Sequence, residues 1–246
     1  MDSLIELVAL IGALEYTQFM RIKHFVMTLL TLAFIGLTAC SGNRVDENDP
    51  AALFKEAEEE VASDHYQIAI DHFRAIKNKF PYSKYAIEAQ IRVADVYFLQ
   101  ESFTEAAAAY ETFRDLHPKH EKTAYAMFRI AKSYYNDIPS VHARDLTPAE
   151  RSVDSYKDFL RRFPQAPQAS EAQTDLKDAL RILAEKELYI ADFYFKRGQK
   201  DPAAARYKKL IELYPESASA EEAKKKLARW SAEKPAAELK NEKSGQ

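Results

Sequence analysis

The chain has 246 residues, of which 47% are hydrophobic, enough to bury a core or a continuous interface between repeats. Its formal net charge is −3 and it has no basic field, so nucleic acid is not an expected partner. One cysteine cannot form an internal disulfide or a thiolate metal cluster. The 5 glycines are too few and too scattered for a Gly-rich phosphate loop.

Residues 20–39 have the order of a secretory signal peptide. Arg21 and Lys23 precede an apolar stretch, residues 25–37, that is short for a membrane span. An ordinary N-terminal anchor helix with a chance cysteine is the alternative interpretation. Residues 1–19 contain three acidic side chains, which do not fit a positive leading segment. We therefore expect Met20 to be the true start and residues 1–19 to be an upstream extension.

The segment Leu37-Thr38-Ala39-Cys40 resembles the bacterial lipobox, at the correct place behind a signal peptide. The resemblance implies that Cys40 is diacylated and becomes the new N-terminus, with acyl chains that attach the protein to a membrane. In lipoproteins an Asp after this cysteine often signals retention in the inner membrane. Ser41 stands there instead, which favours the outer membrane. Residues 40–49 would form a tether.

The rest of the chain is punctuated by prolines that mark a repeat: Pro81, Pro118, Pro164 and Pro215. Eight residues before each proline stands an aromatic residue: Phe73, Tyr110, Tyr156 or Tyr207. A second signature is Ala-x-x-Tyr followed by an aromatic residue, at Ala94, Ala131 and Ala191. These patterns predict pairs of amphipathic helices, with proline ending the second helix of each pair.

The spacing gives a period of 37 residues with two insertions. In regular repeats the signature tyrosine follows one proline by 16 residues and precedes the next by 21. Tyr134 precedes Pro164 by 30 residues, an insertion of nine, and Pro164 precedes Tyr194 by 30 residues, an insertion of 14. We expect the first insertion to be a loop within 136–150, because it contains Pro139 and Pro148. The second contains no helix breaker and predicts a lengthened helix.

A period in the thirties with paired helices and a closing proline resembles the tetratricopeptide repeat. We predict an all-α fold, a tetratricopeptide-like α-solenoid of about five helix pairs with one lengthened helix, over residues 50–230. The pairs are expected near 50–80, 84–117, 121–163 and 168–214, with an incomplete pair at 218–230. Residues 231–246 are polar and are expected to form a disordered tail.

No catalytic or metal site is evident. His117 and His120 are three residues apart, but Pro118 lies between them at a helix junction, so they do not share a helical face. The acidic run at 58–60 is expected to be a solvated helix face. We therefore predict no enzymatic activity, no metal and no cofactor. A periplasmic hydrolase on a helical scaffold is a rival that would require a catalytic constellation.

Two stretches resemble the BamD family of outer-membrane lipoproteins, which serves the β-barrel assembly machinery. They are FPYSKYAIEAQIRVADVYF at 80–98 and LAEKELYIADFYFKRG at 183–198, and the similarity covers nearly all of 40–230. The resemblance implies a lipid-anchored scaffold on the periplasmic face of the outer membrane. Its C-terminal repeats would dock on the periplasmic domains of BamA, and its N-terminal repeats would receive the C-terminal segments of unfolded outer-membrane proteins. Other Bam lipoproteins would be further partners.

By position, the resemblance assigns Phe80 and Tyr82 to the client-binding end and Arg197 and Arg206 to the BamA-binding end. The alternative is that the rings pack in a turn and the arginines form surface salt bridges. A tetratricopeptide lipoprotein adaptor of a pilus, secretin or cell-division complex is the alternative function. It would share the lipobox and the repeats but would not need the helix at 183–198.

The lipobox predicts that the mature protein begins at an acylated Cys40. The intact mass of protein purified from membranes should equal that of residues 40–246 plus acyl chains. A mass that still includes residues 20–39, or an unmodified Cys40, would contradict the assignment.

Overall fold

The computed structural model describes residues 23, 46–141 and 145–244, with side chains only as far as Ser231 at the C-terminal end. The chain divides into two compact units, 1–46 and 47–246, and the fold described below is that of the second. Cys40, the predicted signal peptide and most of the predicted tether lie outside the described residues. None of the helices in the described residues has the length and apolar character needed to cross a membrane.

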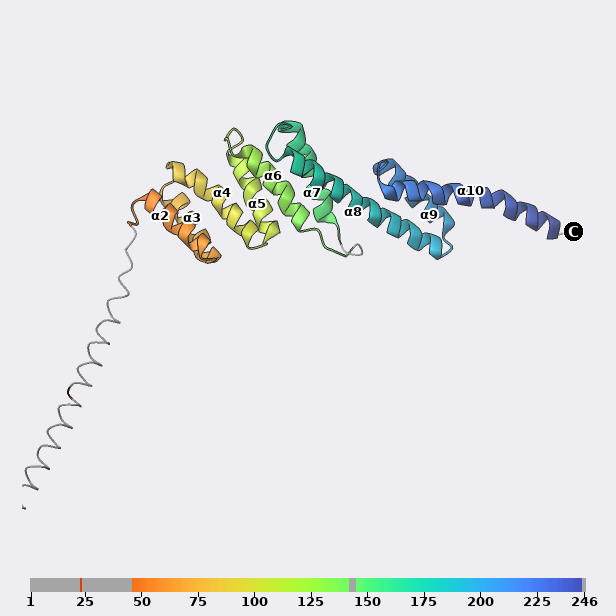
Figure 1. Ribbon diagram of the computed structural model, residues 1–246, viewed down its shortest axis with the longest axis horizontal. Helices are drawn as coiled ribbons and strands as arrows, with labels where there is room; N and C mark the ends of the chain where they lie inside the picture. The colour runs from red at the N-terminus through yellow and green to blue at the C-terminus, as the bar shows by residue number, and fades with distance from the viewer. Residues whose placement is uncertain (1–22, 24–45, 142–144, 245–246) are drawn as a thin grey trace, which may run out of the picture. The chain divides into compact units, whose positions relative to one another are not determined.

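Every regular element in the described part of residues 47–246 is an α-helix (Figure 1). The helices are α2 (Pro50–Ala62), α3 (Tyr66–Lys79), α4 (Lys84–Leu99), α5 (Phe103–Leu116), α6 (Thr123–Asn136), α7 (Thr147–Arg162), α8 (Ala169–Lys196), α9 (Lys200–Leu213) and α10 (Ala218–Ser244). Each helix packs against the next along the chain, and α2, α6 and α8 also contact α4, α8 and α10, respectively. The predicted all-α solenoid of helix pairs is confirmed. We call the even-numbered helices A helices and the odd-numbered ones B helices.

The repeat prolines end the B helices as predicted. The residues just before them, Phe80, His117, Phe163 and Tyr214, have nearly the same backbone angles, with φ between −128° and −132° and ψ between 54° and 56°. These angles lie outside the α region, which a following proline disfavours. The N–H of each still donates to the carbonyl four residues earlier, at 2.8–2.9 Å, and the proline can donate no further bond.

Most A-to-B turns end the A helix with a residue in the left-handed region, at Asp64, Glu101 and Gly198. The next N–H donates to the carbonyl five residues before it, as in Ser102 to Tyr97 at 3.0 Å, which is a Schellman motif. Gly198 adopts its φ of +74° without the steric cost that Asp64 and Glu101 carry at +59°. The α6–α7 connection departs from this turn: its described residues, 137–141 and 145–146, are not helical, whereas Pro148, expected in the loop, lies in the first turn of α7.

The repeat signatures form the core. The aromatic residue eight positions before each proline is at most 1% exposed, and so is the residue five positions before it, from Ile76 to Leu210. On the A helices the alanine of the second signature is fully buried at Ala94, Ala131 and Ala191, and so is Ala57, 37 residues before Ala94 on α2. Small side chains at the helix crossings allow the B-helix aromatics to pack closely. The core is therefore a series of similar clusters along the stack.

Each buried tyrosine on a B helix binds a carboxylate. Tyr110 and Tyr207 donate to the aspartates that directly follow the A-helix alanine of their own repeat, Asp95 and Asp192, both at 2.5 Å. Tyr156 donates to Asp175 of α8 at 2.7 Å. Burial raises the pKa of all three tyrosines well above the ordinary value, with the carboxylates adding to the shift. The hydroxyls therefore stay protonated and act as donors.

Charged pairs join successive A helices. Arg92 binds Glu58 through two hydrogen bonds of 2.6 and 2.7 Å, and Lys226 binds Asp192 at 2.6 and 2.7 Å. In both pairs the acid directly follows the alanine of one A helix, and the cation stands two residues before the corresponding alanine of the next. We call these the acid position and the cation position. They fix the register of neighbouring A helices.

The link between α6 and α8 has the opposite polarity. The acid position of α6 holds Lys132, which lies 2.7 Å from Asp175 and 2.8 Å from Glu171 on α8. Burial alone would lower the pKa of Lys132, but its hydrogen bonds to the two carboxylates raise it. Asp175 stands 11 residues after Pro164, as Arg92 stands 11 residues after Pro81, so it occupies the cation position of the first half of α8.

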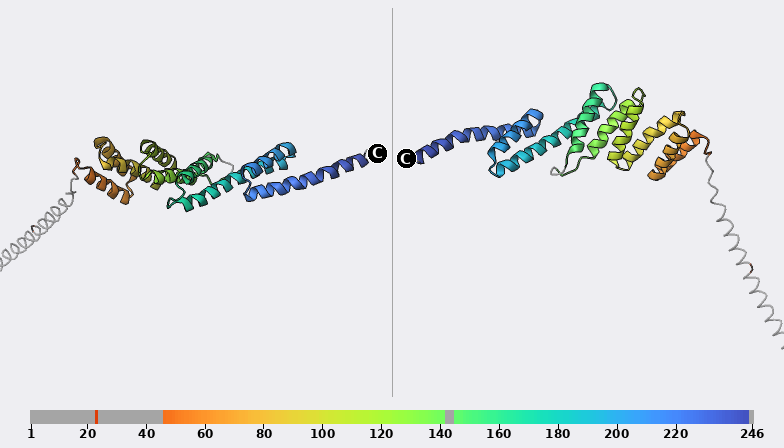
Figure 2. Two further views of the ribbon diagram at one scale, coloured as in Figure 1. Left: turned by 90° about the horizontal axis from the view of Figure 1, so that it is seen from above. Right: turned by 180° about the vertical axis from the view of Figure 1, so that it is seen from behind.

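The second insertion makes α8 a continuous helix of 28 residues, confirming the predicted lengthened helix (Figure 2). Its first half packs beside α7, with Ala172 in the core that contains Tyr156. Its second half packs against α9 and α10, with Ala184 and Ala191 in the core that contains Tyr207. Between these halves, Ala179 and Leu183 belong to a further cluster with Ala149 and Val153 of α7, so one helix contributes to three core clusters.

The C-terminal boundary needs a correction. The sequence predicted that the repeats end at 230 and that a disordered polar tail follows, but α10 runs from Ala218 to Ser244. Residues 231–244 are rich in Ala, Glu and Lys and contain no glycine before Gly245. Strong helix propensity therefore continues a helix that the α8–α9 hairpin has already nucleated, in spite of Pro235.

Replacing Lys132 tests the reversed link. Lys132→Met leaves Asp175 buried without its cation, and we expect a loss of about 3 kcal/mol in the free energy of unfolding, measured from urea midpoints. Lys55→Met is the control, because Lys55 and its partner Glu59 are 80% and 67% exposed. It should change stability by less than about 0.5 kcal/mol. Equal effects of the two substitutions would contradict a structural role for the reversed link.

Candidate interaction surfaces

The predicted client-binding residues lie in the turn between α3 and α4. Tyr82 is 101% exposed, so its ring has no packing role in this chain. Phe80 is half-buried, with Lys79 Nζ 5.7 Å from its ring centroid. The turn therefore offers one free ring beside one that is partly packed. Its role in binding stays a prediction.

An aromatic cluster lies next to this turn. The ring of Tyr85, at the start of α4, is 5.6 Å from that of Phe54, which in turn is 5.2 Å from the buried ring of Phe73. Lys84 Nζ lies 5.1 Å from the Tyr85 ring centroid. Tyr85 is only partly buried, so part of its ring is accessible three residues after Tyr82. The sequence signal for it was its position in the stretch FPYSKY.

Arg197 caps the C-terminal end of α8 on the surface. Its guanidinium carbon is 5.2 Å from the ring centroid of Phe193, one turn earlier. Phe193 and Tyr189 are 47% and 58% exposed, and their spacing of four residues places them on one helix face. We call Tyr189, Phe193 and Arg197 the α8 stripe. A guanidinium beside exposed rings can bind a carboxylate on a partner while the rings contact apolar groups.

Sequence reasoning missed Tyr189 and Phe193, although a signal was present. Tyr189 stands two residues before Ala191, at the cation position that Arg92 and Lys226 occupy on their helices. The preceding A helix, α6, has no acid that could pair with a cation at this place, because its acid position holds Lys132. An aromatic residue in place of a cation marks a helix face that no other A helix of the repeat covers.

Arg206 has a different environment from Arg197. It lies on α9, where Nη1 is 3.2 Å from Glu187 on α8, and Lys209 is 2.8 Å from the same carboxylate. Arg206 is therefore partly occupied within the chain, as the salt-bridge alternative expected. The two arginines belong to the α8–α9 hairpin, whereas Phe80 and Tyr82 lie in the turn between α3 and α4. The chain thus presents two separate candidate surfaces.

A groove of about 770 Å³ opens between α8 and the α9–α10 turn. Leu180, Leu213 and Tyr214 supply its apolar lining, and Lys177 and Glu216 are among the charged residues that line it. Its α8 residues lie between Thr174 and Arg181, before the second half of the helix that packs against α9. The lengthened helix therefore creates a recess that the regular repeat spacing does not provide.

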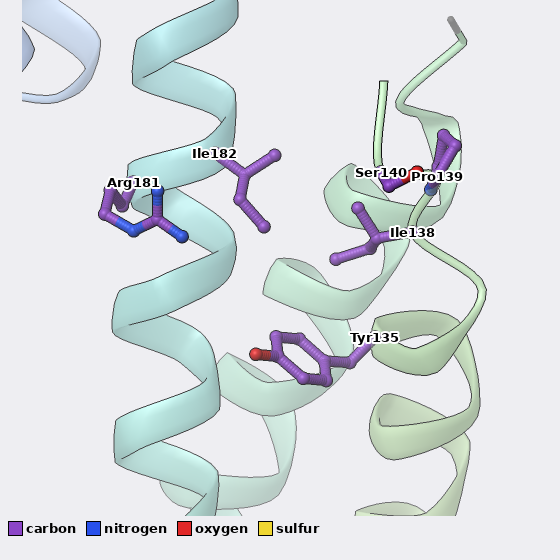
Figure 3. A pocket seen from close by; sticks show the side chains of 6 residues that line it. All are labelled: Tyr135, Ile138, Pro139, Ser140, Arg181 and Ile182. Carbon is purple, nitrogen blue, oxygen red and sulfur yellow. The ribbon is translucent and has the colours of Figure 1, made fainter. Parts of the chain in front are cut away.

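A smaller pocket of about 300 Å³ lies between the end of α6 and α8 (Figure 3). Ile138 and Ile182 face each other across it, and the Tyr135 hydroxyl points toward α8, where it donates to Asp178 at 3.0 Å. Arg181 lines this pocket as well as the larger groove, but it is held by Asp178 and Glu185. The pocket holds no nucleophile with an adjacent base.

The two histidines at the α5–α6 turn contact the same aromatic ring. His117 and His120 lie 5.1 and 5.5 Å from Phe113 and 6.3 Å from each other, measured between ring centroids. His117 Nε2 is 3.2 Å from the Gln90 side-chain oxygen, and His120 Nδ1 accepts from the Lys122 N–H at 3.2 Å. Within the described ranges, no three His, Cys, Asp or Glu side chains are placed to hold a metal ion.

Residues 46–244 match the model of the family described as YfiO, outer membrane lipoprotein. The chain belongs to this family, the BamD family. The matched range includes all helices from α2 to α10, and with them the turn of Tyr82 and the α8 stripe. Cys40 lies before it.

Individual BamD proteins agree with the family match. The outer membrane protein assembly factor BamD of Neisseria gonorrhoeae is 29% identical over 212 residues, covering 79% of each chain. That of Vibrio cholerae is 26% identical over 201 residues, covering 78% of this chain and 83% of the relative. Among solved structures, the TPR2AB domain of yeast Sti1 superposes with a TM-score of 0.42 at 15% identity, over 72% of this chain and 70% of that chain.

The His117 environment predicts a pH-dependent stability for this BamD-family chain. Burial, with His120 and Lys77 adding to it, lowers the pKa of His117 below its usual range. The unfolded chain takes up a proton near the ordinary pKa of about 6.5, whereas the folded chain resists it, so stability falls as the pH drops below that value.

His117→Gln should flatten this slope. We expect the urea midpoints of the variant to differ from wild type by a constant offset above about pH 7 and to fall less steeply between about pH 6.5 and pH 5. The offset reports the lost ring contacts, and the slope reports the titration. An unchanged slope would show that other groups cause the acid sensitivity.

Proposed function

We propose that this chain is a non-enzymatic assembly factor for outer-membrane β-barrel proteins. The observation that carries the proposal is the family match over 46–244, together with relatives that are themselves named outer membrane protein assembly factors. A stack of helix pairs with exposed aromatic surfaces suits a scaffold, because its binding surfaces are extended helix faces and turns.

The scaffold links two partners through its two ends. The client end uses Phe80 and Tyr82 to bind the C-terminal segments of unfolded outer-membrane proteins, which the full exposure of Tyr82 supports. The other end uses Arg197 and Arg206 to bind the periplasmic domains of BamA, with other Bam lipoproteins beside it. Arg197 is the stronger contributor, because Arg206 is already paired with Glu187.

The membrane attachment comes from Cys40. Acyl chains on this residue hold the helical stack at the periplasmic face of the outer membrane, and the short segment before Pro50 acts as the tether. Holding a client-binding surface and a BamA-binding surface on one anchored chain raises the effective concentration of client near the insertase. The chain thereby promotes folding and insertion of the clients.

Depletion of the protein in its host tests the proposal. Outer-membrane barrel levels should fall, unfolded barrel proteins should accumulate in the periplasm, and BamA should co-purify with the chain in mild detergent. Normal barrel levels after depletion would refute the assembly role. Co-purification with a secretin, pilus or division protein instead of BamA would support the alternative adaptor function.

Two substitutions separate the two ends. Tyr82→Ala should leave the melting temperature unchanged and weaken capture of client peptides. Leu116→Ala is its control, because Leu116 is an exposed apolar residue at the end of α5.

Arg197→Ala should keep client capture but reduce affinity for BamA by about tenfold, the value of one charge-assisted contact. Its control is Arg161→Ala, which removes an exposed arginine held by Asp158.

A further inference from the structure

Arg129 is a cation at a repeat position where its counterparts bind acids of this chain. It stands two residues before Ala131 on α6, as Arg92 stands before Ala94 and Lys226 before Ala228. Arg92 pairs with Glu58 and Asp95, and Lys226 pairs with Asp192 and Glu222. Among the described residues, no carboxylate forms an ion pair or a hydrogen bond with Arg129.

The carboxylate that Arg129 would be expected to bind is already taken. Asp95, at the acid position of α4, accepts Tyr110 at 2.5 Å and Tyr125 at 2.8 Å through one oxygen. Its other oxygen accepts Arg92 at 2.9 Å. The second acid of the Lys226 site stands four residues before the lysine, and Tyr125 occupies that place before Arg129. Burial, with Asp95 adding to it, raises the pKa of Tyr125 to about 12, so this hydroxyl stays neutral.

Aromatic groups hold the guanidinium in place. Its carbon lies 3.6 Å from the ring centroid of Phe98 and 5.7 and 5.8 Å from those of Tyr110 and Tyr125. Arg129 Nε donates to the Tyr110 hydroxyl at 3.1 Å, which leaves the two terminal nitrogens without a partner in the described chain. A stacked guanidinium with one nitrogen fixed has lost much of its rotational freedom before any ligand arrives.

The terminal nitrogens of Arg129 are open to solvent. In the part of the chain that the structure describes, buried side-chain nitrogen and oxygen atoms without a hydrogen-bond partner belong to His72, Ser83 and Ser152. Arg129 is not among them, although it is only partly exposed. Its unpartnered N–H groups therefore keep some solvent exposure, which a ligand needs in order to reach them.

We propose that Arg129 is a binding site for the side-chain carboxylate of an aspartate or glutamate on a partner polypeptide. The planar fork of the guanidinium matches a carboxylate, which is also what the equivalent cations bind within this chain. The face of Phe98 beneath the guanidinium shields one side from water and strengthens the contact. Arg129 lies on a different helix from Arg197 and Arg206, so failure of this proposal leaves the proposed assembly role intact.

Nuclear magnetic resonance of the arginine side chains tests the site directly. The full mature chain, labelled at arginine nitrogens and held in detergent micelles, is titrated with acetyl-Gly-Glu-Gly-amide. The Arg129 signals, assigned by their loss in Arg129→Lys, should shift, and the Gln analogue should bind about tenfold more weakly. Arg74 is the internal control, because it also donates to a tyrosine hydroxyl and lies 5.9 Å from that ring, but it occupies no cation position.

Further ligands and one variant decide between chemistries. Two other anions should bind more weakly than the Glu peptide: inorganic phosphate, and a peptide that is blocked at its N-terminus but has a free terminal carboxylate. The Phe98→Leu variant, checked for helix content, should show a smaller shift of the Arg129 signals when the Glu peptide is added. The proposal is overturned if Arg129 signals move no more than those of Arg74. It is also overturned if the Gln peptide binds equally well, or if phosphate or the terminal carboxylate binds more tightly.

Discussion

The helical stack depends on buried and partly buried carboxylates between neighbouring helices. A buried carboxylate is stable only when hydrogen bonds and a cation replace the water it has lost. Asp95, Asp175 and Asp192 meet this requirement with a tyrosine from a B helix and a cation from an A helix. The Asp175 and Asp192 sites each join three helices in this way, and Asp95 does so through Tyr125 of α6, because Arg92 lies on the same helix as Asp95. Each site therefore helps to set the register of one repeat relative to the next.

The insertion in α8 changes how this constraint is met. Counted from Pro164, the regular cation position of α8 falls at Asp175, and counted from Ala191 it falls 14 residues later, at Tyr189. Lys132 pairs with Glu171 and Asp175 on the first half of α8, and Tyr189 takes the place of a cation on the second half. The insertion thus accounts for the exposed α8 stripe and the groove beside the α9–α10 turn, whereas the reversed link keeps the regular repeat spacing. The candidate BamA-binding surface exists because the repeat is interrupted there.

Much of the fold could be predicted from sequence, because its determinants are local and periodic. The repeat prolines locate the ends of the B helices, and the spacing of tyrosines and prolines predicts both insertions. The reversed polarity at Lys132 was not predicted, although Asp175 stands 11 residues after Pro164, at the position that holds Arg92 and Arg129 in the preceding repeats. The helical continuation of α10 was missed because a polar composition was given more weight than helix propensity.

Of the candidate sites, exposure separates Tyr82 and Arg197 from the partly packed Phe80 and the paired Arg206. Arg129 has no acid partner because Arg92, and not Arg129, reaches Asp95. The spacing of residues in the sequence does not show which of the two arginines does so.

The continuous α8 also fixes an angle. An α-helix turns by about 100° per residue, so an insertion of 14 residues corresponds to about 3.9 turns and returns to nearly the same rotational phase. The last repeat is therefore carried roughly 20 Å along the helix axis while it keeps almost the same side of it. Adding or removing a single residue in this helix would swing α9 and α10 by about 100° around α8. The length of α8 thus determines the direction in which α9 and α10 face, as well as their distance from the N-terminal repeats.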